Sequence, residues 1–98
     1  MDTLQLVAEP RRRAILGMIW KEELAAGDIA SRFNVTFGAV SQHLRKLADS
    51  GLVSVRADGN RRLYRARPEA VGPLRDVLEQ MWRSSLDDLA GIVEAADK

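Results

Sequence analysis

Apolar residues in the first half of the chain recur every three to four positions, in four successive segments. This spacing is typical of helices that bury one face. Residues that start or stop helices bound the segments: Pro10 suits a first turn, Thr36 an N-terminal cap and Gly51 a left-handed C-terminal position. The pattern predicts helices over residues 3–8, 10–20, 26–33 and 37–50.

The spacing then changes from a helical period to a period of two. LVSVRA (52–57) and RRLYRA (61–66) are short candidate strands, and Asp58-Gly59-Asn60 between them predicts a hairpin tip. From Glu69 to Val93 the helical spacing returns, with Gly72-Pro73 delaying or bending the first turn. The sequence therefore predicts a mainly α fold with a small β-hairpin, in a single domain over residues 1–98.

The net charge of +1 hides an asymmetry along the chain. Between Arg32 and Arg67 there are eight basic and two acidic residues, a balance of +6. Between Glu69 and Lys98 there are three basic and seven acidic residues, a balance of −4. A basic middle segment joined to an acidic end indicates a module that binds polyanions. The alternative is that these charges only solvate the surface.

The order of the predicted elements gives this basic segment a specific interpretation. Two short helices joined by a tight turn, then a basic hairpin, are typical of a winged helix-turn-helix, here in the order α-α-α-α-β-β-α. The second of these helices enters the DNA major groove. Val40, Leu44 and Leu47 would hold it to the core, so Gln42 and Arg45 point away. Gln can pair with adenine, and Arg with guanine, through two hydrogen bonds.

Two stretches, EPRRRAIL (9–16) and GDIASRFNVTFGAVSQHLRKLADSGLVSVRADGNRRLYRA (27–66), resemble the ArsR-type winged-helix transcriptional regulators. The most specific parts are VSQHLRKL, the following SGLV and a wing of the form G-N-R-R-x-Y. The tail VLEQMWRSSLDDL (77–89) is similar to the branch that lacks metal sites and often acts as simple repressors or autorepressors. The resemblance implies a homodimer that binds an inverted-repeat operator. It places Thr36, Ser41, Gln42, His43 and Arg45 in the recognition helix and Arg61 and Arg62 in the wing. Phe37-Gly38 departs from the family, which more often has a polar or Pro-containing pair there.

The residues and the resemblance together define a predicted DNA-contacting set. Lys46, Arg61 and Arg62 suit phosphates, while Gly38 would permit close approach of the backbone. His43 lies at the edge of the apolar stripe, where it is either packed or in contact with a phosphate. The set is Thr36, Gly38, Ser41, Gln42, His43, Arg45, Lys46, Asn60, Arg61 and Arg62.

The first and last predicted helices carry apolar residues beyond what the compact part of the domain covers. They predict a dimer interface, with residues 68–94 as a C-terminal dimerisation helix. A twofold dimer would present two recognition helices to half-sites one DNA turn apart. The alternative is that the last helix folds back on its own domain and the protein is monomeric. The predicted interface residues are Leu4, Leu6, Val7, Leu78, Met81, Trp82, Leu86, Leu89 and Val93.

The remaining composition argues against other chemistry. The chain has no cysteine and one histidine, the stretch 22–30 lacks the cysteine motif of the family's metal sensors, and residues 68–98 contain no histidine. We therefore expect no metal site and no cofactor. No arrangement of a nucleophile with a base is evident, so we expect no catalytic residues. The sequence contains no run of about 18 apolar residues, so it predicts no membrane span. We expect a cytoplasmic location.

Two other functions stay open at this point. One is a ligand- or metal-responsive sensor of the same fold, with a pocket near Trp20 or Trp82; the sequence identifies no effector. The other is a winged-helix module that binds a partner protein, against which the basic wing argues.

Overall fold

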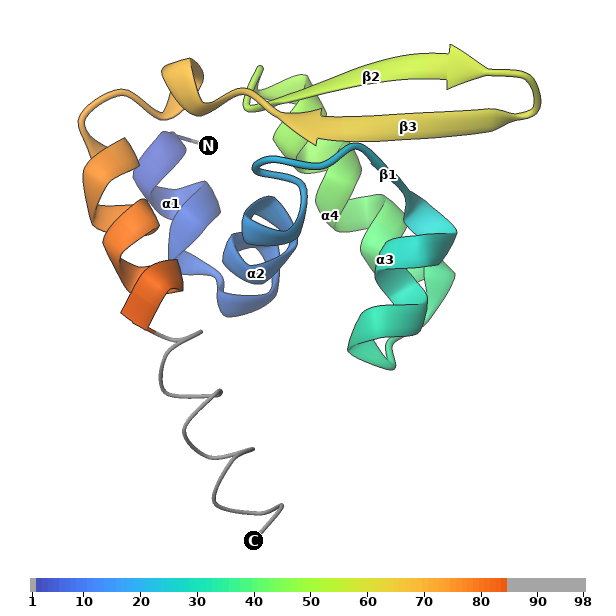
Figure 1. Ribbon diagram of the computed structural model, residues 1–98, viewed down its shortest axis with the longest axis horizontal. Helices are drawn as coiled ribbons and strands as arrows, with labels where there is room; N and C mark the ends of the chain where they lie inside the picture. Colours follow the sequence, from blue (N-terminus) through green and yellow to red (C-terminus); the bar gives the residue numbers. More distant parts are fainter. Residues whose placement is uncertain (1, 85–98) are drawn as a thin grey trace, which may run out of the picture.

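The computed structural model describes residues 2–84, in which helices pack beneath a small antiparallel sheet (Figure 1). The predicted winged helix-turn-helix is confirmed, and the first four helices and both hairpin strands begin and end within two residues of their predicted bounds. In chain order the elements are α1 (Thr3–Ala8), α2 (Pro10–Met18), β1 (Leu24–Ala25), α3 (Ala26–Phe33), α4 (Phe37–Asp49), β2 (Val53–Asp58), β3 (Arg61–Ala66), the 3-10 helix η1 (Pro68–Val71) and a C-terminal helix described over residues 74–84.

The helices begin and end where side chains or backbone geometry satisfy free backbone groups. The carboxylate of Glu9 caps α2 by accepting a hydrogen bond from the Arg12 N–H at 2.8 Å. The Thr36 hydroxyl caps α4 by accepting from the Ala39 N–H at 3.1 Å. Helix α3 ends at Asn34, whose left-handed φ of 55° turns the chain toward α4. The start of α4 is therefore fixed by the turn at Asn34 and the cap at Thr36.

The sheet has three strands in the order β1-β3-β2, all antiparallel, where the sequence predicted only a hairpin. The missed strand, β1, pairs Leu24 with Tyr64 and Ala25 with Leu63. Two residues are too few to show a period of two, so the pattern does not reveal this strand. The hairpin tip is Gly59-Asn60, with Gly59 at φ 63° in the first central position, as a tight two-residue turn requires.

The core lies under the sheet and between the helices (Figure 1). Ile29 of α3 and Val40, Leu44 and Leu47 of α4 have no solvent-exposed surface. The predicted inward stripe of α4 is thereby confirmed. Because this stripe holds α4 to the core, its opposite face lies at the surface beside the hairpin.

The prediction of one helix across residues 68–94 is wrong at its start. Pro68–Val71 form the separate helix η1, the chain turns at Gly72 with φ 59°, and the C-terminal helix begins after Pro73. A residue before proline is disfavoured in the helical region, which separates the two helices. The break at Gly72-Pro73 was itself predicted, and residues 85–94 lie outside the described residues.

The predicted dimer-interface residues divide into two groups. Leu6, Val7 and Leu78 are buried within one chain, so they belong to its own core and their assignment to the interface is corrected. Periodicity shows that a face is apolar but not what covers it. Leu4 and Met81 are exposed and Trp82 is half-buried. The other three residues lie outside the described part of the chain: Leu86, Leu89 and Val93.

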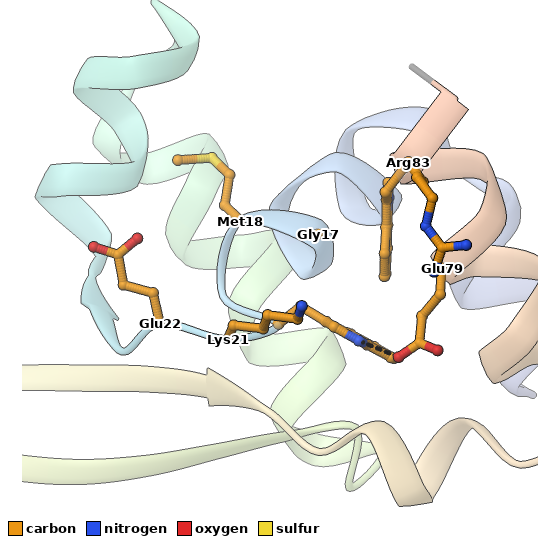
Figure 2. Close-up of a pocket in the computed structure, with 8 residues that line it drawn as sticks. Gly17, Met18, Lys21, Glu22, Glu79 and Arg83 are labelled. Atoms are coloured by element: carbon orange, nitrogen blue, oxygen red, sulfur yellow. Dashed lines mark hydrogen bonds between the residues drawn. The ribbon is translucent and has the colours of Figure 1, made fainter. Parts of the chain in front are cut away.

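A tryptophan pair joins the C-terminal helix to the end of α2. The rings of Trp20 and Trp82 meet edge to face with centroids 4.7 Å apart, and the Trp20 indole N–H donates to the Glu79 carboxylate at 2.8 Å (Figure 2). This hydrogen bond lowers the pKa of Glu79. Gly17 permits the contact, because a Cβ there would lie 2.8 Å from Nε1 of Trp82.

We expect Gly17→Ala to lower the free energy of unfolding by about 1–2 kcal/mol, although alanine favours a helix interior over glycine by about 1 kcal/mol. The added methyl must displace the Trp82 ring from α2. Gly27→Ala is the matched control, since a Cβ on Gly27 meets nothing within 4 Å. Urea unfolding should show a loss for the first variant and no loss for the second. A shift of the same sign in both would contradict the packing argument.

Candidate nucleic-acid interface

Helices α3 and α4 form the helix-turn-helix, joined by the short segment 34–36. The buried stripe of α4 leaves Gln42, Arg45 and Lys46 exposed on the far side of the helix. Gly38 is exposed beside them, and a Cβ on it would meet nothing within 4 Å. The outer face of α4 therefore presents one amide and two cations next to a position without a side chain.

A groove separates α4 from the β2–β3 hairpin, or wing. Two cavities of about 460 and 550 Å³ lie along it and share Phe37, Ser41, Arg62 and Tyr64. We call this the wing groove. Figure 1 shows the hairpin extending outward over α3 and α4. Along the groove the structure brings together five of the predicted DNA contacts: Ser41, Arg45, Asn60, Arg61 and Arg62.

The cations of the basic segment fall into two classes. Within residues 2–84, Arg45, Lys46, Arg62 and Arg65 form no ion pair with an acidic side chain. Three of them lie on the outer face of α4 or in the wing groove, while Arg65 follows Tyr64 and points to the other face of the hairpin. The others form ion pairs: Arg32–Glu22 at 3.6 Å, Arg56–Glu23 at 2.8 Å, Arg61–Asp28 at 2.8 Å and Arg67–Glu69 at 3.3 Å.

Arg61 differs in this respect from its neighbour Arg62. Its Nη2 donates to Oδ2 of Asp28, in the first turn of α3. The same carboxylate oxygen accepts from the Ala25 N–H at 3.4 Å. Arg61 thus links the tip of the wing to the start of α3, whereas Arg62 lines the groove and has no ion pair within residues 2–84.

His43 lies on the flank of α4 that faces away from the wing groove. Its Nδ1 is buried, is 4.0 Å from Oε2 of Glu9 and has no hydrogen-bond partner among the described residues. Burial lowers the pKa of His43, so the imidazole is neutral at pH 7. The buried Nδ1 favours the packed alternative for His43, whose side chain is 20% exposed, and its place among the DNA contacts stays a prediction.

Two predicted residues take positions at the ends of the surface. Thr36 uses its hydroxyl as the cap of α4, and Asn60 lies at the exposed wing tip. Phe37 and Tyr64 also line the groove, although neither was among the predicted site residues. Phe37 could have been found, because a large apolar residue at the predicted start of the helix lies off its buried stripe. Tyr64 depends on strand register, which the pattern alone leaves open.

A third cavity, of about 440 Å³, lies against the tryptophan pair, near the position predicted for a sensor pocket. Figure 2 shows Gly17 and Lys21 on one side of it and Glu79 and Arg83 of the C-terminal helix on the other. Its Glu79 is already held by Trp20 and by Arg75 at 3.4 Å. Within residues 2–84 no group of three or more acidic or histidine side chains could hold a metal ion, and no helix is long and apolar enough to cross a membrane.

Comparisons with known proteins agree with this geometry. Residues 9–55 match the family described as bacterial regulatory protein, arsR family. The chain is 35% identical to the HTH-type transcriptional regulator Rv2034 of Mycobacterium tuberculosis, over 93% of this chain and 85% of that protein. The structure of NolR from Sinorhizobium fredii matches with a TM-score of 0.71 and 34% identity, over 81% of this chain and 79% of that one. The homodimeric winged helix-turn-helix DNA-binding domain of Mb0332 from Mycobacterium bovis matches with a TM-score of 0.70 and 28% identity, over 83% of this chain and 75% of that one. The chain therefore belongs to the ArsR family of bacterial regulatory proteins and is a winged-helix, DNA-binding transcriptional regulator.

Proposed function

We propose that this regulator binds an inverted-repeat operator as a homodimer and represses transcription, including that of its own gene. The observation that carries the proposal is the charge pattern of one surface. The outer face of α4 and the wing groove hold Arg45, Lys46 and Arg62, which form no ion pair in the described part of the chain, next to the amide of Gln42. Cations without intramolecular partners are available to phosphates and base edges.

The roles of these residues follow from their positions and chemistry. Gln42 and Arg45 point outward from α4 and read base edges in the major groove. Lys46 and Arg62 contact phosphates on either side of the groove. Arg61 holds the wing to α3 through Asp28 and so sets the position of Arg62. The small Gly38 lets the backbone approach the DNA closely.

Exposed apolar residues on the first and last helices support the homodimer. Leu4 is 61% exposed, Val77 54% and Met81 41%. A second copy would cover these side chains. The homodimeric Mb0332 domain supports the same assembly for this chain. Two recognition helices would then meet half-sites about 34–36 Å apart.

The proposal is tested by fluorescence anisotropy with duplex DNA from the upstream region of the gene, against a scrambled duplex. We expect tight, salt-sensitive binding to the upstream duplex and weak binding to the scrambled one. Sedimentation should give two protein chains per duplex. Equal weak binding to both would contradict autoregulation, and no binding at low salt would favour a module that binds a partner protein.

The base-reading role of Arg45 has its own test. In a panel of operators with single base-pair changes, Arg45→Ala should lose discrimination at one position per half-site, by about 5–150-fold. Arg65→Ala is the matched control, because it removes the same charge from the face of the hairpin away from the groove. We expect it to keep the base preferences of the unaltered protein. If Arg45→Ala kept them as well, the base-reading role would be wrong.

A further inference from the structure

Phe37 is the first residue of α4, and its side chain is 61% exposed. A large aromatic ring at the surface normally packs against a neighbour or serves a binding partner. The ring lies off the buried stripe of Val40, Leu44 and Leu47 and contributes nothing to the core. It borders both cavities of the wing groove instead, beside Ser41.

The backbone fixes where Phe37 lies at the start of α4. Asn34 ends α3 in a left-handed conformation, and the Thr36 hydroxyl caps α4 one residue before Phe37. The N-terminal residues of a recognition helix are the ones that reach base edges. Phe37 thus lies at the end of α4 that enters the major groove deepest, one turn before Ser41 and two turns before Arg45.

The chemistry of the ring restricts what it can recognise. Phenylalanine has no hydrogen-bond donor or acceptor, so it reads none of the polar groups on base edges. The major groove presents one apolar group, the C5-methyl of thymine, and phenylalanine is among the side chains that contact it. Arg45 and Arg62 line the same cavity as Phe37, and their charges favour DNA over an apolar partner at this edge of the protein.

We propose that Phe37 packs on the C5-methyl group of one thymine in each half-site and selects that base. This inference rests on the proposed DNA-reading function and adds a base to its specificity. Burial of a methyl group contributes about 0.8 kcal/mol, which corresponds to about fourfold in affinity. Removing the methyl alone, without changing any hydrogen bond of the base pair, isolates this contact.

The experiment replaces each operator thymine in turn by deoxyuridine, which lacks only the C5-methyl. The operator is first selected from random duplexes with the unaltered protein. We expect one position per half-site where deoxyuridine weakens binding about fourfold. For Phe37→Ala, thymine and deoxyuridine should bind equally at that position. Because the ring of Phe37 is exposed, Phe37→Ala should fold as the unaltered protein does. Circular dichroism would check this.

Val55→Ala is the matched control. Val55 is 43% exposed and lines the same groove from β2, but it lies on the wing rather than on the recognition helix. This variant should keep the preference for thymine over deoxyuridine. Equal binding of all deoxyuridine operators by the unaltered protein would overturn the inference, as would a preference that persists in Phe37→Ala. Failure to select any duplex would instead overturn the proposed function, and the inference with it.

Discussion

Raising the monovalent salt concentration from 50 to 200 mM is expected to weaken operator binding about 150-fold. Each protomer places three cations that form no ion pair within residues 2–84 at the DNA-facing surface, namely Arg45, Lys46 and Arg62. A twofold dimer would bring about six of them to phosphates or base edges. Lys46 and Arg62 are the cations that contact phosphates, which makes about four phosphate contacts in a dimer. Each neutralised phosphate releases condensed counterions, so four contacts give a log–log slope of about −3.6.

Anisotropy titrations at four salt concentrations would measure this slope. Arg62→Ala should make it shallower by about 2, one contact for each protomer. Arg56→Ala is the control, because Arg56 donates to both carboxylate oxygens of Glu23, at 2.9 and 2.8 Å. Its charge is already paired, so this variant should leave the slope unchanged. A slope near zero would contradict phosphate binding by this surface. Equal effects of the two substitutions would contradict the division between paired and free cations.

That division illustrates what the sequence alone cannot provide. Eight basic residues in one segment predict a polyanion-binding surface, and the pattern treats them alike. The Asp28–Arg61 and Glu23–Arg56 pairs each join residues 33 positions apart, so they depend on the fold. Arg61 and Arg62 are adjacent and identical in chemistry, yet one holds the wing and the other forms no ion pair in the part of the chain that the structure describes.

The local structure of the recognition helix, by contrast, could be predicted almost completely. Its buried stripe, the Thr36 cap and the left-handed Gly51 all depend on neighbours within four residues. What failed were the features set by other elements. Strand β1 exists because β3 pairs with it, and Leu6, Val7 and Leu78 are covered by the same chain rather than by a second one. The glycine inside α2 likewise depends on another element, because the Trp82 ring packs against Gly17.

Leu44→Ala is expected to lower the free energy of unfolding by about 2–5 kcal/mol. Leu44 has no exposed surface and lies in the middle of the stripe that holds α4 to the core. The substitution removes buried carbon atoms and leaves a cavity that the surrounding helices fill only in part. Urea unfolding followed by circular dichroism would measure it. Both proteins must be compared at one concentration, because association stabilises a dimer.

Gln42→Ala provides the control on the same helix and separates folding from recognition. Gln42 is exposed on the outer face of α4, so its removal should change the unfolding free energy by less than about 0.5 kcal/mol while relaxing base preference at one operator position. Leu44→Ala should do the reverse: the fraction that remains folded should keep the base preferences of the unaltered protein. A loss of stability in Gln42→Ala as large as that in Leu44→Ala would show that the outer face of α4 is packed rather than free. That result would remove the basis for placing it in the major groove.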